Sequence, residues 1–173
     1  GTVDIPAYLS AMKESRHPVR SACPSPDLYA KDMVSCEGDC FVVTLSSKLS
    51  GSHNAAMIGR DLALEEAPDK KIHVFDSESA CSGETYLALM IHDLIDAGKS
   101  FNEIVELVEE KIRTLHTLFV LDSLDNLVKN GRISKAVALL ANVLSIRLLM
   151  SDDGAGSIKN ISKARGIKGA LTQ

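Results

Sequence analysis

The chain has no tryptophan, few other aromatic residues and no excess of positive charge. Aromatic residues make up 4% of its 173 residues, and 19 lysines and arginines are outnumbered by 23 aspartates and glutamates. The formal net charge is therefore −4. Proteins that bind nucleic acid need basic patches that neutralise phosphates, and many also present aromatic rings to the bases. The composition argues against a nucleic-acid-binding protein.

A long hydrophobic run is also missing. A membrane-spanning helix needs about 20 consecutive apolar residues, whereas the longest apolar stretch, residues 136–146, is interrupted by Asn142 and Ser145. The first residues do not show the basic and apolar pattern of a secretory signal peptide. We therefore expect a cytoplasmic protein without integral membrane association, long enough for one ordinary domain or two small ones.

Sequence patterns of metal and nucleotide sites are absent as well. The four cysteines contain no CxxC pair, and their spacing suits reduced thiols better than a disulfide framework. The five histidines show no HExxH or paired-ligand spacing. Gly154-Ala155-Gly156 lies between two expected strands, which is the wrong context for a phosphate-binding loop. We expect no metal and no cofactor.

What the chain does contain is an alternation of apolar runs and helical patterns. Residues 41–45 and 71–75 are apolar runs of the length of a buried strand, and residues 53–66 and 83–97 have helical spacing. Strand–helix–strand–helix order predicts a parallel sheet with crossover helices. We expect this α/β unit to form a first domain over residues 1–99.

A second α/β domain is expected over residues 100–173. It begins where Ser100 and Glu103 have the spacing of a capping box. The elements expected after this helix are a strand at 118–121, a short helix around 124–128, a helix over 134–144, a β-hairpin whose strands flank 152–156, and a helical tail from Lys163.

The most informative stretch is residues 40–56, CFVVTLSSKLSGSHNAA, in which an apolar run ends at a Ser/Gly-rich turn and a helical pattern follows directly. A helix N-terminus has unpaired N–H groups and a partial positive charge, so it can hold a carboxylate or phosphate. The same residues also fit a structural helix cap by Ser50 or Ser52. A nucleophile–base pair of Ser50 and His53 is a further reading, although no orienting carboxylate accompanies it.

Four segments of the chain stand out together. They are LSSKLSGSHNAA at 45–56, FDSESA at 75–80, LDSLDNLVKNGRISKAVALLANVLSIRLLM at 121–150 and DGAGSIKNISKARGIKGAL at 153–171. In this order, and over almost the whole chain, they resemble the DegV family of bacterial fatty-acid-binding proteins. The resemblance implies a two-domain α/β carrier, not an enzyme, that buries a long-chain fatty acid's acyl tail between its domains and holds the carboxylate at the first.

The resemblance also implies which residues bind the ligand. A first loop is present here as Ser21-Ala22-Cys23-Pro24-Ser25, with Ser21 in place of threonine and Cys23 in place of glutamine. The second loop is the Ser/Gly-rich turn at residues 46–52, which we call the serine turn, and in it Ser52 replaces threonine. The carboxylate is expected on Ser21, Ser50, Gly51 and Ser52. Apart from the resemblance, a fatty acid needs a long apolar slot that ends in a few polar donors. Candidates for lining this slot are Leu121, Leu124, Leu127, Ile133 and Leu140, with Val128, Leu139 and Val143 beside them. Ordinary core packing is the alternative for these residues.

Family members present their fatty acid to a separate kinase that makes acyl phosphate, so a fatty acid kinase is the partner that the resemblance implies. Candidates for a docking face are Lys129, Arg132, Lys135 and Arg147. Members normally begin with a further strand and continue beyond the last helix, so we expect an internal piece lacking both termini. The alternative that stays open is an enzyme for a small phosphorylated or carboxylated metabolite, with the Ser50 turn as its anion hole.

Overall fold

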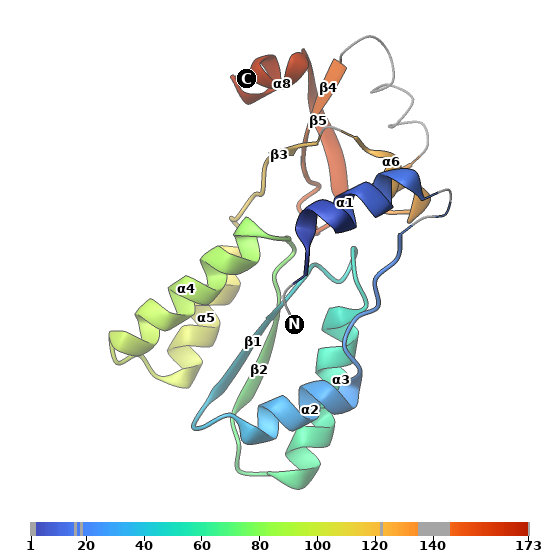
Figure 1. Ribbon diagram of the computed structural model, residues 1–173. Coiled ribbons are helices and arrows are strands. Elements are labelled where there is room, and N and C mark those ends of the chain that lie inside the picture. Colours follow the sequence, from blue (N-terminus) through green and yellow to red (C-terminus); the bar gives the residue numbers. More distant parts are fainter. Residues whose placement is uncertain (1–2, 16, 18, 122, 135–145, 173) are drawn as a thin grey trace.

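The computed structural model describes residues 3–172 except residues 16, 18, 122 and 135–145. Its first half is a small parallel sheet between two pairs of helices (Figure 1). β1 (Cys40–Thr44) and β2 (Ile72–Asp76) pair in parallel, as the strand–helix order predicted. The covering helices are α2 (Pro26–Ser35) and α3 (Ser52–Glu66) on one face, and α4 (Ser82–Asp96) and α5 (Phe101–Ile112) on the other.

Alternation along the two strands divides their apolar side chains between two cores, because successive side chains of a strand point to opposite faces. Phe41 and Phe75 pack with α4 and α5. Val42 and Val74 pack with α2 and α3. Gly59 lets α3 approach α2 closely, since a Cβ at this position would lie 2.6 Å from the Cβ of Tyr29. Both faces of the sheet are therefore covered.

Helix starts follow local chemistry closely. Ser25 caps α2, where its hydroxyl accepts from the Leu28 N–H at 3.4 Å. At α5 the capping box is present, with the Ser100 N–H donating to Glu103 Oε2 at 2.9 Å. This backbone hydrogen bond, together with the Ser100 hydroxyl, lowers the pKa of Glu103 to about 2. Both caps involve residues only a few positions apart, and the one at Ser100 was predicted from the sequence for that reason.

The second half of the molecule is an antiparallel sheet in the order β3-β4-β5. Its elements are β3 (Phe119–Val120), α6 (Asp125–Lys129), β4 (Ile146–Asp152), β5 (Ile158–Arg165) and α8 (Gly166–Leu171). The predicted hairpin is confirmed. The helical tail expected from Lys163 is wrong for its first residues, because β5 continues to pair with β4 until Arg165 lies opposite Ile146. The helix predicted over 134–144 falls almost wholly outside the described residues.

Helix α5 belongs to the core of the first half. Ile104, Val108 and Ile112 pack with Leu87 and Ile91 of α4. The division of the chain into two domains stays a prediction, but this packing favours a boundary after Ile112 rather than at residue 100. A capping box marks where a helix begins and carries no information about the core against which that helix packs.

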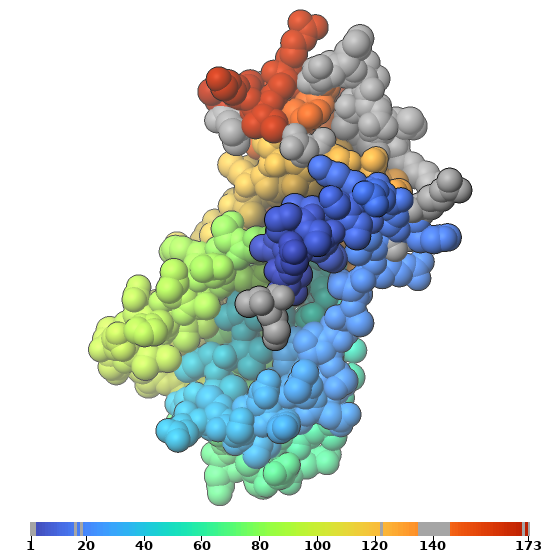
Figure 2. All heavy atoms as spheres, viewed as in Figure 1, coloured from blue at the N-terminus to red at the C-terminus, as the bar shows by residue number. Residues whose placement is uncertain are grey.

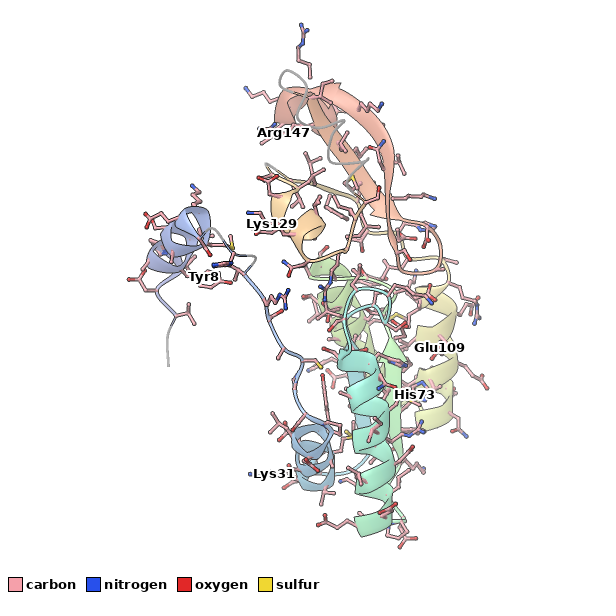
Figure 3. The ribbon with its side chains drawn as sticks, turned by 90° about the vertical axis from the view of Figure 1, so that its right-hand side faces the viewer. Tyr8, Lys31, His73, Glu109, Lys129 and Arg147 are labelled. Atoms are coloured by element: carbon pink, nitrogen blue, oxygen red, sulfur yellow. The ribbon has the colours of Figure 1, made fainter. Side chains whose placement is uncertain are left out.

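Helix α1 (Ile5–Glu14) lies on the outside of the molecule, across the boundary between the two halves (Figure 2). None of its residues is buried, and it stands apart from the other helices in Figure 3. None of the helices in the described part of the chain is both long and apolar enough to cross a membrane.

Candidate functional site

The serine turn lies where the two parallel strands end. Open α/β sheets bind ligands beyond the carboxyl ends of their strands, where the connecting loops meet. Here the turns after β1 and β2 are joined directly. The Ser46 N–H donates to Ser79 O at 2.9 Å, and the Ser47 N–H donates to Asp76 Oδ1 at 3.0 Å. The sheet therefore holds the serine turn in a fixed position.

A cleft of about 800 Å³, lined by both polar and apolar groups, opens beside this turn. We call it the polar cleft because the serines predicted to hold a carboxylate line it. Three segments line it, namely the loop at 19–24, the serine turn, and α6 with the turn that follows it. The cleft brings together all four residues predicted to hold a carboxylate: Ser21, Ser50, Gly51 and Ser52. Their binding role stays a prediction, although their meeting in one cleft is what that role requires.

The donors around the serine turn face the start of α3. Gly51 is the N-cap residue of α3. The alternative prediction, that Ser50 or Ser52 is the N-cap residue of this helix, is therefore wrong. The hydroxyls of Ser50 and Ser52 lie 2.9 Å apart, and the Ser50 hydroxyl accepts from the Ser52 N–H at 3.2 Å. No described residue accepts a hydrogen bond from the backbone N–H of His53 or Asn54. These N–H groups leave the helix N-terminus able to receive an anion.

The two loops that were predicted to share the head group are in contact. A Cβ on Gly51 would lie 3.4 Å from Cys23 Sγ, so the chain at Gly51 runs directly beside the first loop. Cys23 also lines the cleft, and its thiol is free. The substitution of cysteine for glutamine therefore lies at the cleft itself.

His53 does not act on Ser50 in this arrangement. Its Nδ1 lies 3.3 Å from the hydroxyl of Thr44, which itself donates to Phe75 O at 3.1 Å. Because the single hydroxyl hydrogen of Thr44 is used in that bond, Nδ1 of His53 is the donor to Thr44. The hydroxyl of Ser50 pairs with Ser52 instead. The geometry does not support the nucleophile–base reading.

An apolar cavity of about 380 Å³ adjoins the polar cleft. The two share four lining residues: Leu45, Leu49, Leu127 and Arg132. Leu118, Phe119 and Ile158 add apolar surface to the cavity. A ligand with a polar end and an apolar chain can therefore occupy both spaces at once.

The residues predicted around the acyl tail divide into three groups. Leu121 and Leu127 line the apolar cavity. Leu124 and Ile133 are 6% and 8% exposed and belong to the core of the second half. Leu140 lies outside the described residues, as do Leu139 and Val143. Val128 packs against that same core. Helical spacing alone does not distinguish a cavity wall from core packing, so the tail contacts stay a prediction.

Sequence reasoning missed Leu45 and Leu49, which line both spaces. The sequence did offer a sign of this role, because both are apolar residues within the serine-rich LSSKLSG segment. It also missed Phe119 and Ile158. Nothing in the sequence marks these two as cavity residues, since they are reached only when the antiparallel sheet is placed beside the serine turn.

The hairpin closes one wall of the cavity. The hydroxyl of Ser46, which is fully buried, donates to Gly156 O at 2.7 Å. Gly156 has a φ of 82° and leaves no room for a side chain. Glu78 lines the same cavity, and burial, followed by the charges of Asp76 and Asp152, raises the pKa of its carboxyl. The two halves therefore meet at a buried hydrogen bond beside the apolar cavity.

The turn Asn130-Gly131-Arg132 forms hydrogen bonds to the first loop and to the serine turn. Asn130 Nδ2 donates to Val19 O at 3.0 Å, two residues before Ser21. Arg132 Nε donates to Leu49 O at 3.1 Å, directly before Ser50. The same turn therefore positions both walls of the polar cleft.

Two of the four residues proposed for a docking face lie at the cleft. These are Lys129 and Arg132. Arg147 is on β4, and Figure 3 shows it farther from the parallel sheet than Lys129. Lys135 lies outside the described residues. Within the described part of the chain, no group of three or more His, Cys, Asp or Glu side chains is placed to hold a metal ion.

Known proteins are similar to this chain in sequence and in fold. The family model described as "Uncharacterised protein, DegV family" matches residues 2–173. A DegV domain-containing protein of Streptococcus pneumoniae is 40% identical over 167 residues, which cover 96% of this chain and 59% of that protein.

Two solved structures extend the similarity. The fatty acid kinase (Fak) B3 protein of Streptococcus pneumoniae, loaded with linoleic acid, is 39% identical with a TM-score of 0.92, covering 99% of this chain and 61% of its own. A DegV family protein of Ruminococcus gnavus, with vaccenic acid, is 41% identical with a TM-score of 0.89, covering 98% and 60%. This chain thus spans 59–61% of the length of these relatives. The family model covers nearly every residue, and the chain belongs to the DegV family.

Proposed function

We propose that the protein binds a long-chain fatty acid and carries it without transforming it. The observation that carries this proposal is the contact between a polar cleft and an apolar cavity through Leu45, Leu49, Leu127 and Arg132. A fatty acid is an apolar chain with one weak acid, and its site needs an apolar space that ends in a few polar donors. The fatty acids in the two similar solved structures support the same ligand class.

The two ends of the ligand have different energetic roles. Each methylene that leaves water contributes about 0.8 kcal/mol, or about fourfold in affinity, so the tail supplies most of the binding free energy. The carboxylate needs orientation and satisfied hydrogen bonds. In this proposal Ser21, Ser50, Gly51 and Ser52 provide them together with the free N–H groups at the start of α3.

We further propose that the bound fatty acid is presented to a fatty acid kinase, so that the chemistry belongs to the partner. The relative named fatty acid kinase (Fak) B3 supports this assignment. Lys129 and Arg132, which line the cleft, are the members of the proposed docking face that both lie among the described residues and belong to the cleft. A cytoplasmic location is part of the proposal, since the four cysteines are free thiols, as reducing compartments maintain them.

A small-metabolite enzyme fits the site less well. A hydrolytic or transfer reaction at Ser50 needs a base within hydrogen-bond reach. His53, the base that the sequence offered, is engaged with Thr44. The apolar cavity would also have no role in recognising a small polar substrate.

Organic extraction of the purified full-length protein, followed by mass spectrometry, tests the proposal. We expect one fatty acid per chain, and an empty extract with no binding of added linoleic acid would refute the carrier role. The double variant Ser50→Ala/Ser52→Ala should weaken binding of linoleic acid by about tenfold, because hydrogen bonds to a charged group contribute about 1.5 kcal/mol or more. Ser35→Ala is the matched control, since Ser35 is exposed and lines neither space.

A further inference from the structure

We propose that Cys36 and Cys40 form a reversible disulfide when a small-molecule disulfide, such as glutathione disulfide, oxidises the folded protein. The pair is a modification site that lines neither the polar cleft nor the apolar cavity, and the inference does not depend on the proposed function. Spacing along the sequence favoured reduced thiols at all four cysteines. The fold directs two of these thiols into the same core.

The two cysteines lie at the junction of α2 and β1. Cys36 is the C-cap residue of α2, and Cys40 is the first residue of β1. The Cys36 N–H donates to Asp32 O at 3.0 Å, and the Cys40 N–H donates to Lys71 O at 2.8 Å. Residues 37–39 form a bend between them. The helix and the sheet therefore fix the backbone at the two ends of a short bend.

Both side chains are directed toward the core between the sheet and the pair α2 and α3. Cys40 is 6% exposed and belongs to this core, and Cys36 packs against it. The Cys36 thiol also lies over the bend, 3.7 Å from Glu37 O and 3.9 Å from Asp39 O. Asp39 directly precedes Cys40. The charge and the hydrogen bonding of Cys36 act on the Cys40 thiol, so the two sulfur atoms are neighbours.

The two thiols differ in access, and this difference sets the order of reaction. Cys36 is half-buried, whereas Cys40 is buried. Burial, followed by the charge of Cys36 and hydrogen bonding with its side chain, raises the pKa of the Cys40 thiol to about 11. The thiolate is the attacking species in disulfide exchange. Cys36 is therefore the thiol that attacks the small-molecule disulfide, and Cys40 reacts second.

Lys70 favours the second step. Its ammonium group donates to Cys36 O, and its positive charge lowers the pKa of the Cys40 thiol. Once Cys36 carries glutathione, its sulfur no longer ionises, so the charge of Cys36 no longer raises that pKa. The Cys40 thiolate then forms more readily, beside the sulfur that it must attack.

The exchange is balanced in atoms and electrons. The Cys36 thiolate attacks one sulfur of glutathione disulfide, which forms a mixed disulfide and releases one glutathione thiolate. The Cys40 thiolate then attacks the Cys36 sulfur, so that the bond between Cys36 and Cys40 forms and the second glutathione leaves. The protein loses two protons and two electrons, and glutathione disulfide takes up both. The product links the end of α2 to the start of β1.

Mass spectrometry of the folded full-length protein after incubation with glutathione disulfide tests the proposal. The background is Cys23→Ser/Cys81→Ser, because these are the exposed thiols of the described residues. We expect a product that has lost two hydrogens, carries no glutathione and gives a peptide joined through Cys36 and Cys40. The folded protein should need about tenfold less glutathione disulfide than the same protein in urea, because the fold holds the two sulfur atoms close together.

Single substitutions in the same background separate the two steps. Cys40→Ser should stop the reaction at the mixed disulfide on Cys36, and Cys40→Ala replaces it if serine at this buried position prevents folding. Cys36→Ser should leave the buried Cys40 thiol unmodified. The inference is overturned if both thiols stay reduced, if the mixed disulfide persists although Cys40 is present, or if folded and urea-unfolded protein are oxidised equally.

Discussion

Substitution of Gly156 by alanine tests how the two halves of the molecule are joined. Gly156 has a φ of 82°, and a Cβ placed there would lie 2.3 Å from Ser46 Oγ and 3.2 Å from the Cα of Glu78. Real Cβ atoms essentially never lie as close as 2.3 Å to another heavy atom, and 3.2 Å is a tight contact. The side chain of Ser46 must therefore move, and its hydrogen bond to Gly156 O breaks in a fully buried setting.

Two terms set the size of the effect. A non-glycine residue in the left-handed region costs about 1–2 kcal/mol. A buried hydroxyl that loses its partner costs about 1–3 kcal/mol more. We therefore expect Gly156→Ala to lower the free energy of unfolding by about 2–5 kcal/mol, a large fraction of the stability of an ordinary domain.

Urea unfolding of Gly156→Ala and Gly154→Ala measures this effect with a matched control. Gly154 lies in the same hairpin turn with a φ of 83°, but nothing lies within 4 Å of its added Cβ. Gly154→Ala should therefore cost only the backbone term, about 1–2 kcal/mol. Equal losses in the two variants would refute the reasoning. Ser46→Ala combined with Gly156→Ala should cost less than the two single changes together, because the clash with Oγ disappears.

Two further predictions concern packing and charge. Gly59→Ala should destabilise the protein in thermal unfolding by about 1–3 kcal/mol, since its Cβ would meet Pro26 O at 2.7 Å; Gly169→Ala, with ordinary contacts in α8, should not. The pKa of Glu78 is raised above its ordinary value of 4.5 in the folded protein, so ionisation of this carboxyl destabilises the fold as the pH rises. Glu78→Gln should therefore raise the free energy of unfolding at neutral pH. It should have no such effect below pH 4.5, where Glu78 is protonated in both states. Equal effects of Glu78→Gln at both pH values would contradict this account.

Local structure could be predicted where the signal lay within a few residues. The cap at Ser100 and the strand before the serine turn were both predicted, because short-range hydrogen bonds and apolar spacing decide them. The pairing of Arg165 with Ile146 was not, because strand pairing joins residues far apart in the chain. The tail was therefore expected to become helical too early.

The candidate site shows the same division. Ser21 and Ser50 were chosen through a family resemblance, and the structure brings them to one cleft. Leu124 and Leu127 were chosen by the same helical spacing, yet one is buried in a core and the other lines the cavity. Spacing describes which face of a helix is apolar and does not describe what lies opposite that face.

The sequence by itself determined the α/β class, the hairpin and the donors of the serine turn, since these depend on periodicity, turn chemistry and capping over short distances. Tertiary structure alone decided that Leu45 and Leu49 join the polar cleft to an apolar cavity, and that Arg132 stands between them. A cavity forms where segments that are distant in the chain do not fill the space between them, and the fold decides which side chains line it. Both depend on the packing of the whole molecule.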